Sequence, residues 1–331
     1  MEQKKLVLTV GAMAILLALV LRLITIAPME NEAFLSFMVY LQTGRLVRYW
    51  ESDAPTVPPA TAPKPTIPQV QPSAGLQFTA ADGECVQLYD FTAASPNVET
   101  LLLQPLRWNL TGKEPTVLIL HTHATESYTK QSGEIYEESS DYRTFNPSYN
   151  MLSVGEELTR VLTAGGISVL HDRTLHDYPS YSGSYDHARK TIAAYLEAFP
   201  SIQLVIDLHR DALDLGAETQ LTTSATVGNQ QSAQLMLVAG SDQKASHPDW
   251  QENLAVSVKL TAILEKMYPG ITRPLQLRAQ RFNLDMTPGS ILVEVGANGD
   301  THSQAVVAVR ALGAAILAMS QGVNLQNAPP S

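Results

Sequence analysis

The sequence predicts an α/β fold: a mainly parallel sheet with helices on both faces, preceded by a membrane anchor and a Pro-rich spacer. Three observations lead to this prediction. Short apolar runs alternate with amphipathic, helix-length segments after residue 116, the pattern of a parallel sheet covered on both sides. A stretch near the N-terminus is apolar enough, and long enough, to cross a membrane. A run of prolines separates the two regions and is typical of an extended spacer.

The composition limits the classes of protein that need to be considered. The chain has 331 residues, of which 45% are hydrophobic and 16% charged, so it can bury a core and extensive disorder is not expected. The net charge of -10 argues against nucleic acid as a partner, because phosphates need a basic surface. Cys85 is the one cysteine. A metal site would therefore be built from histidines and carboxylates.

The N-terminal segment 1–28 is expected to be an uncleaved transmembrane anchor. Residues 6–27 form an apolar run whose one charged residue is Arg22, and roughly 20 apolar residues span a bilayer. A cleaved signal peptide is the alternative, but the run is longer than the usual apolar region of roughly 7–15 residues. Lys4 and Lys5 favour a cytoplasmic N-terminus. The expected protein is a single-pass cell-membrane protein with an extracytoplasmic catalytic domain.

The rest of the chain divides by composition. We expect a juxtamembrane helix at 29–50, a Pro-rich linker at 51–74, a small β-rich lead-in at 75–115, a catalytic domain at 116–322 and a flexible tail at 323–331. Within the catalytic domain, apolar runs predict strands and amphipathic segments predict helices. The expected strands are 116–120, 167–170, 202–208, 235–239 and 291–295, and the expected helices are 150–164, 185–199, 250–267 and 303–319.

Polar side chains follow or end three of these predicted strands. His121 and His123 come directly after the strand 116–120, His209 follows 202–208, and Glu294 lies near the end of 291–295. In open α/β sheets, sites form outside the carboxyl ends of the strands. We therefore expect these side chains to lie at one edge of the sheet.

Their chemistry matches a catalytic zinc site, in which three protein ligands leave one position for water and a separate carboxylate takes the proton of that water. We expect Zn²⁺ to be held by His123, Glu126 and His209, with Glu294 as the catalytic base. His123 and Glu126 stand three residues apart, a spacing that a turn can close onto one ion. His121 is expected to support the ligands instead, through a hydrogen bond to a ligand or a backbone carbonyl.

Other residues keep two readings. Arg210 and Asp211 adjoin His209 and either contact substrate or form a surface salt bridge. The remaining histidines are expected to be cleft or loop residues (His171, His176 and His187), a surface residue (His247) and a helix-start residue (His302). If Glu126 is not the carboxylate ligand, the reserve candidates are Glu134, Glu137, Glu138 and Asp141. The sequence shows no Gly-x-Ser-x-Gly elbow and no Gly-rich phosphate loop after a strand.

Four segments resemble the stage II sporulation protein P family: "VLILHTHATESY", "SVGEEL" with "GISVLHD", "VIDLHRDA" and "GSILVEVGAN". The resemblance runs from about residue 116 to the C-terminus, and the region before it resembles the family in layout. The catalytic region also looks like the zinc N-acetylmuramoyl-L-alanine amidases, which implies roles for His123, His209 and Glu294. Those amidases usually take a zinc carboxylate from the start of the first helix, where this chain has Asn150. The His-x-x-Glu order is similar to zinc carboxypeptidases and favours Glu126.

The resemblance implies a peptidoglycan hydrolase that cuts the bond between N-acetylmuramic acid and L-alanine, with an endopeptidase activity as a second option. It also implies septal wall thinning and engulfment during endospore formation, with a lytic transglycosylase and septal membrane proteins as partners. Two alternatives stay open, a zinc peptidase that cuts only stem-peptide bonds and a non-catalytic, membrane-tethered wall-binding scaffold.

Overall fold

The computed structural model describes residues 78–106, 109–213 and 221–321. All of them belong to the second of two compact units, which covers 59–331. The expected anchor at 1–28, the juxtamembrane helix at 29–50, the linker at 51–74 and the tail at 323–331 lie outside the described residues.

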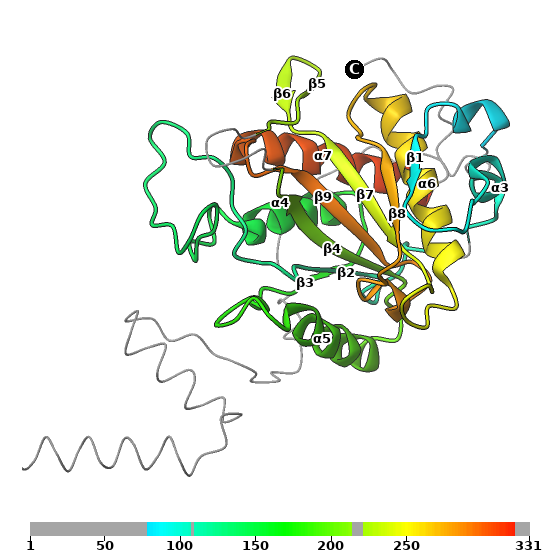
Figure 1. Cartoon of the computed structure of the whole chain (residues 1–331), viewed down its shortest axis with the longest axis horizontal. Helices are drawn as coiled ribbons and strands as arrows, with labels where there is room; N and C mark the ends of the chain where they lie inside the picture. The colour runs from blue at the N-terminus through cyan, green and yellow to red at the C-terminus, as the bar shows by residue number, and fades with distance from the viewer. Residues whose placement is uncertain (1–77, 107–108, 214–220, 322–331) are drawn as a thin grey trace, which may run out of the picture. The chain divides into compact units, whose positions relative to one another are not determined.

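The core of the described region is a seven-stranded sheet with the order β1-β8-β7-β9-β4-β2-β3 (Figure 1). Its strands are β1 (Leu88–Asp90), β2 (Val117–Leu120), β3 (Val169–His171), β4 (Leu204–Asp211), β7 (Leu235–Gly240), β8 (Leu275–Arg278) and β9 (Ile291–Ala297). The strands β3, β2, β4 and β9 are mutually parallel, β7 is antiparallel to β9, and β8 and β1 are parallel to β7. The mainly parallel sheet is thus confirmed, with one antiparallel pairing.

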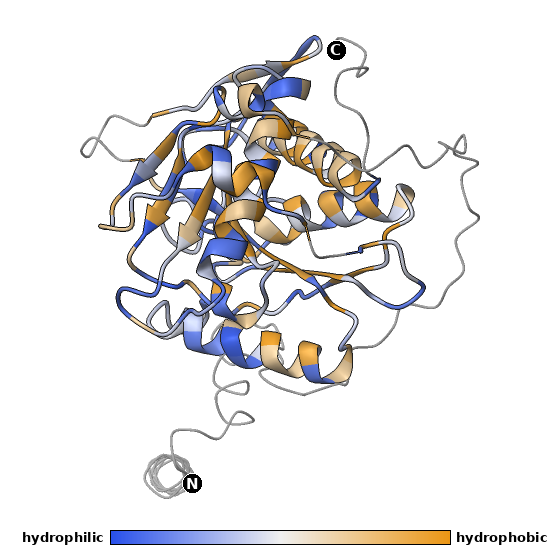
Figure 2. Ribbon diagram, turned by 90° about the vertical axis from the view of Figure 1, so that its right-hand side faces the viewer, coloured by the Kyte–Doolittle hydropathy of each residue, from blue (hydrophilic) through white to orange (hydrophobic). Residues whose placement is uncertain are grey.

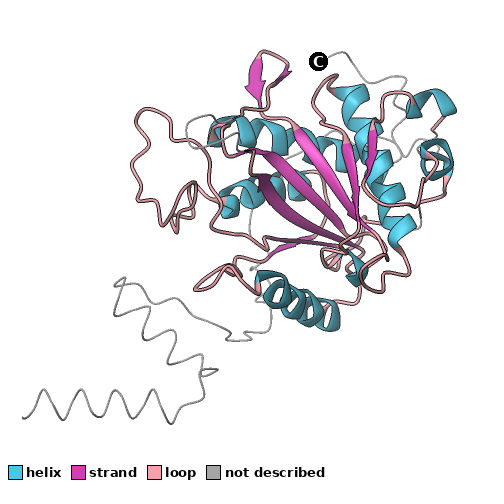
Figure 3. Ribbon diagram, viewed as in Figure 1, coloured by secondary structure: helices cyan, strands magenta, loops and turns pink. Residues whose placement is uncertain are grey.

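Helices cover both faces of the sheet, as expected (Figure 3). On one face lie α4 (Met151–Ala164), α6 (Trp250–Met267) and α7 (His302–Gln321), and on the other lies α5 (Ser184–Ala198). The strand β2 shows why two cores form, since its residues alternate between faces. Val117 and Ile119 belong to the core under α4, α6 and α7. Leu118 and Leu120 belong to the core under α5.

The start and end of α4 follow from local interactions. The Asn150 side chain accepts the Leu152 N–H at the start of α4, which satisfies one of the free donors of a helix N-terminus. Gly165 and Gly166 end the helix, and Gly166 has a φ of 91° that glycine adopts without a steric penalty.

The segment before residue 116 differs from the expectation. Its described part contains the single strand β1, the short helix α3 (Val98–Leu103) and a 3-10 turn, so the expectation of a β-rich lead-in is wrong. Asp90 ends β1 because its carboxylate accepts the N–H groups of Thr92 (2.7 Å) and Ser95 (2.9 Å). β1 pairs with β8, from Leu88 opposite Leu275, and so this segment is an edge of the main sheet.

Two further elements were not predicted. They are the strand β8 and a small hairpin formed by β5 (Ala225–Val227) and β6 (Gln230–Ser232). Among the described helices, α7 alone is long and apolar enough to cross a membrane, but its buried residues belong to the core beneath the sheet. Figure 2 shows the same distribution, with apolar residues concentrated in the strands and long helices.

Candidate active site

Two of the predicted site residues lie within strands. His209 is inside β4, which runs past its predicted end, and Glu294 is inside β9. They are register partners in the parallel ladder, and register partners on adjacent strands project from the same face of a sheet. This face is the one that α5 covers. Val205 lies four residues before His209 and so on the same face of β4, and it packs in the core under α5.

The turn after β2 separates the two histidines of its "HTH" motif. His121 is fully buried against α4, where its Nε2 lies 2.9 Å from His171 Nε2. Its Nδ1 donates to Leu208 O at 3.2 Å, the carbonyl that precedes His209. His121 therefore makes the expected bond to a backbone carbonyl.

His123 lies in an aromatic enclosure on the other side of the turn. Its ring stacks on Tyr181 with 4.3 Å between ring centroids and 9° between planes, and it meets Tyr185 edge-on at 5.7 Å. The His209 ring is 5.2 Å away, also edge-on. Burial lowers the pKa of His123 to about 4, so the imidazole is neutral at pH 7, and its Nδ1 has no hydrogen-bond partner. A neutral imidazole with an open nitrogen is a suitable metal ligand.

Glu126 is buried beside His209, and three groups approach its carboxylate. Arg143 Nη2 and the Arg210 N–H each lie 3.3 Å from it, and His209 Nδ1 lies at 3.9 Å. Its backbone carbonyl accepts the Met151 N–H at 3.0 Å, which places Glu126 at the start of α4.

This placement bears on Asn150, which stands at the helix start where a carboxylate ligand was expected from the resemblance to zinc amidases. Asn150 is buried, and both ends of its amide are used: Oδ1 accepts the Leu152 N–H and Nδ2 donates to Thr144 O, each at 3.0 Å. It is a structural cap. Glu126 accepts the N–H of Met151, the residue after Asn150, with its backbone carbonyl. Its side chain is therefore the carboxylate found at this helix start.

A residue that the sequence analysis missed, Asp207, lies against His209. Asp207 is buried, accepts the N–H and hydroxyl of Thr122, and lies 3.0 Å from His209 Nε2, as an ion pair rather than an aligned hydrogen bond. Burial alone would raise the pKa of Asp207, but His209 and Thr122 outweigh it and lower the pKa to about 2. The available signal was its position within the buried run "IQLVIDL", since carboxylates are rarely buried without a partner.

The charges around His209 and Glu294 are strongly coupled. Burial alone would lower the pKa of His209, but Asp207, Glu294 and Glu126 raise it to about 10. Burial, reinforced by Glu126 and Asp211, raises the pKa of Glu294 to about 8. Glu294 Oε2 is inaccessible to solvent and has no hydrogen-bond partner. A carboxyl group with a pKa near neutrality can both accept and return a proton at working pH.

Arg210 and Asp211 have different surroundings. Arg210 is buried, and it donates from Nε to Ser127 O and from Nη2 to Tyr142 O, each at 2.9 Å. These bonds tie the turn after β2 to β4. Asp211 pairs with Arg273 at 2.7 Å near the surface, in line with the salt-bridge reading.

The other polar residues fall outside this cluster or support it. His176 is buried and donates from Nδ1 to His121 O at 2.9 Å, so it braces the turn. His302 begins α7, as expected. The expectation of a surface position for His247 is wrong: it is buried, and its Nε2 lies 3.1 Å from Asn253 Oδ1, because the first turns of α6 present that amide inward.

The reserve carboxylates stay on their own loop. The Glu134 carboxylate accepts the Gln131 N–H at 2.9 Å, and Glu138 pairs with Lys130 at 3.7 Å. Glu137 and Asp141 are exposed.

The donor set fits zinc in its chemistry. Two imidazoles, a carboxylate and a further carboxyl group lie together, and His123 Nδ1, His209 Nε2 and Glu294 Oε2 are buried without aligned partners. Within the described ranges, no three His, Cys, Asp or Glu side chains surround a common point. Arg143 contacts Glu126, and Asp207 contacts His209. The ligand set His123, Glu126 and His209 stays a prediction.

Comparisons with known proteins identify relatives of this chain. A family model described as Stage II sporulation protein P (SpoIIP) matches residues 67–317. The Stage II sporulation protein P of Bacillus subtilis (strain 168) is 27% identical over 199 residues, which cover 56% of this chain and 46% of that protein. The chain thus matches about half the length of this curated relative.

Two solved structures resemble the fold more distantly. An N-acetylmuramoyl-L-alanine amidase from Clostridium difficile 630 has a TM-score of 0.38 at 17% identity, covering 64% of this chain and 96% of that chain. An N-acetylmuramoyl-L-alanine amidase of Nostoc punctiforme has a TM-score of 0.36 at 12% identity, covering 63% and 97%.

Proposed function

The chain belongs to the stage II sporulation protein P family, and from that premise we propose that it is a peptidoglycan hydrolase. The proposed reaction is hydrolysis of the amide bond between N-acetylmuramic acid and L-alanine, with endopeptidase cleavage of peptide cross-links as a second activity. The observation that carries the proposal is the register pairing of His209 with Glu294, beside the turn that bears His123 and Glu126. The pairing puts a ligand-type imidazole and a proton-accepting carboxyl group side by side on one face.

The proposed cofactor is Zn²⁺, held by His123, Glu126 and His209. When bound, zinc would act as a Lewis acid and lower the pKa of water to about 7. The buried carboxylates Glu126 and Asp207 support a cation here, since they already hold the pKa of His209 at about 10. A site that retains a proton so firmly has an excess of negative charge that a metal ion would neutralise.

Glu294 is the proposed acid and base. Its carboxylate takes a proton from the attacking water as the water oxygen bonds to the amide carbon. It returns that proton to the nitrogen as the carbon–nitrogen bond breaks. The products are a carboxylate on the lactyl group of the sugar and a free L-alanine amine. Its pKa of about 8 suits both steps at neutral pH.

The proposed setting follows from the family. The chain would act in septal wall thinning and engulfment during endospore formation, as a single-pass membrane protein with its catalytic domain outside the cytoplasm. Its proposed partners are peptidoglycan, a lytic transglycosylase and septal membrane proteins.

Product analysis tests the reaction. The full-length chain, loaded with zinc, is incubated with purified peptidoglycan, and the products are identified by mass spectrometry. An amidase releases whole stem peptides and leaves glycan without peptide. Shortened peptides on intact muramoyl amides would instead indicate a peptidase. No released product would overturn the hydrolase proposal and favour a wall-binding scaffold.

A further inference from the structure

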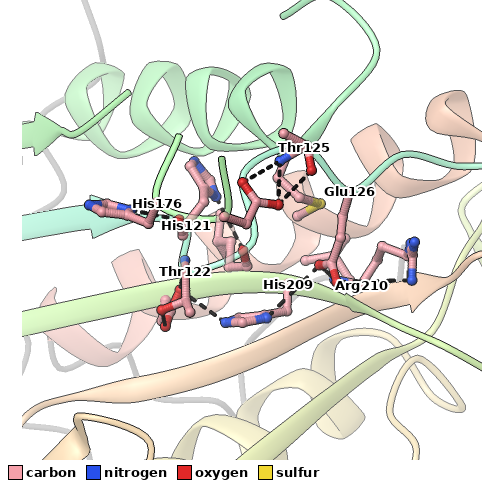
Figure 4. Close-up of polar contacts among 12 residues, drawn as sticks. His121, Thr122, Thr125, Glu126, His176, His209 and Arg210 are labelled. Atoms are coloured by element: carbon pink, nitrogen blue, oxygen red, sulfur yellow. Dashed lines mark hydrogen bonds and ion pairs between the residues drawn. The ribbon is translucent and has the colours of Figure 1, made fainter. Parts of the chain in front are cut away.

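Two threonines in the turn after β2 bind buried aspartates in the same way. Thr122 donates its N–H to Asp207 Oδ1 (2.8 Å) and its hydroxyl to Asp207 Oδ2 (2.6 Å). Thr125 donates its N–H (3.2 Å) and its hydroxyl (2.5 Å) to Asp177 Oδ2. All four residues are buried. Dashed lines mark the bonds at both threonines in Figure 4. We call these pairs the Thr122 clamp and the Thr125 clamp.

The Thr122 clamp ties the turn to the strand that carries His209. Asp207 is the register partner of Leu120, the last residue of β2. Its side chain therefore holds the chain just where the β2–β4 ladder ends, one residue before His123. The same carboxylate lies 3.0 Å from His209 Nε2. One aspartate thus contacts both the His209 ring and the backbone next to His123.

The Thr125 clamp reaches Glu126 in a parallel way. Asp177 accepts a hydrogen bond from Arg143 Nη1 at 2.8 Å, and Arg143 Nη2 donates to Glu126 at 3.3 Å. Asp177 thus holds the backbone of Thr125 and, through one guanidinium, the carboxylate of the next residue.

We propose that Asp207 and Asp177 are positioning residues, whose threonine clamps fix the His123–Glu126 turn against His209. The inference rests on the proposed function, because it assigns these aspartates to the predicted ligands. Without the clamps, the turn would keep its sequence but gain rotational freedom. Ligands held loosely bind an ion less tightly, and partners that orient metal ligands typically contribute about 10–100-fold in affinity.

A third clamp of the same kind gives a matched control. Thr223 donates its N–H (2.9 Å) and hydroxyl (2.7 Å) to Asp300, and both residues are buried. Its partners at the carboxylate include the Ala297 N–H, at the end of β9. It therefore reports the cost of losing such a clamp elsewhere in the fold.

The experiment compares Thr122→Val, Thr125→Val and Thr223→Val in the full-length chain. Valine keeps the branched shape and the backbone N–H but removes the hydroxyl. Zinc affinity is measured by competition with a chromophoric chelator. Hydrogen exchange of the backbone amides from 121 to 128 is measured on the metal-free protein. Thr122→Ser and Thr125→Ser restore the hydroxyl.

Zinc affinity should fall about 10–100-fold in the first two valine variants, recover in the serine variants, and stay within about twofold of wild type in Thr223→Val. Amide exchange in the turn should quicken only in the first two. Equal affinity in all three valine variants, or unchanged exchange in the turn, would overturn the positioning role. If wild type binds no zinc, the proposed cofactor fails, while the exchange measurement still decides whether the clamps hold the turn.

Discussion

His209 and Glu294 are register partners on the parallel strands β4 and β9, although 84 residues separate them in the sequence. Neighbouring strands lie about 4.8 Å apart, so the pairing brings two ionisable side chains together on the face that α5 covers. His123 and Glu126 belong to the turn after β2. The strand β2 is the parallel neighbour of β4 on the side away from β9. Three adjacent strands therefore build the site.

The identity of the carboxylate ligand can be tested by comparing Glu126→Ala with Asn150→Ala. The first should lose most of its zinc, because it removes the carboxylate beside His209. The second should keep its zinc but lower the free energy of unfolding by roughly 0.5–2 kcal/mol, the usual cost of a lost N-cap. Metal analysis and denaturant unfolding measure the two effects. Zinc loss in Asn150→Ala alone would assign the ligand position to the helix start.

A methyl group at Gly155 should disrupt the histidine pair behind the site. A Cβ there would lie 2.5 Å from Nε2 of both His121 and His171, which forces at least one ring to move. Overpacking of this kind costs roughly 1–3 kcal/mol, against a gain of up to about 1 kcal/mol in helix propensity. Thermal unfolding should therefore show a lower Tm for Gly155→Ala.

Gly83→Ala is the control for that change. Its Cβ would meet Val98 and Leu102 at 3.6 Å and 3.7 Å, which is ordinary contact. Its Tm should match or slightly exceed that of wild type. If Gly155→Ala is equally stable, the two histidine rings are not packed against α4 as described.

In the metal-free protein, the contribution of Glu294 to stability should be lost as the pH rises from about 5 to 8, whereas His123, whose pKa is lowered from 6.5 to about 4, acts in the opposite direction below pH 6.5. The pKa of Glu294 is raised from 4.5 to about 8, so between these values the folded state binds more protons than the unfolded state. Stability from this group is complete below pH 4.5 and is lost as the pH passes 8. In Glu294→Gln this contribution disappears, so the Tm of the variant should fall less across the window. Parallel Tm curves for the two proteins, measured with a chelator present, would contradict the raised pKa.

Periodicity predicted the central architecture because each core strand and helix carries its own apolar pattern. The four longest predicted helices and the strands β2, β3, β4, β7 and β9 follow from such runs. The strand β8 and the β5–β6 hairpin were missed because they carry no continuous apolar run. β8 takes its extended form by pairing with β7 and β1. The prediction of a β-rich lead-in was wrong because local side-chain bonds shape this segment. Asp90 ends β1, and Asn97 caps the start of α3.

The candidate site was predicted in its parts but not in its arrangement. Counting strand ends predicted that His123, His209 and Glu294 lie close together at one edge of the sheet. The side chains do lie near one another, but His209 and Glu294 lie within β4 and β9 rather than at an edge. His121, which was expected to have a supporting role, lies against α4. Counting strand ends did not reveal Asp207, Asp177 or Arg143, because their roles depend on contacts between segments 17 to 85 residues apart.

The most direct test of the proposed hydrolysis is Glu294→Gln, measured for zinc content and for release of stem peptides from peptidoglycan. Glutamine keeps the size of the side chain but cannot accept the proton. The variant should retain zinc at the wild-type ratio and lose peptide release by several powers of ten, because the attacking water loses its proposed proton acceptor. Wild-type release from the zinc-loaded variant would contradict the role of Glu294 and the mechanism built on it.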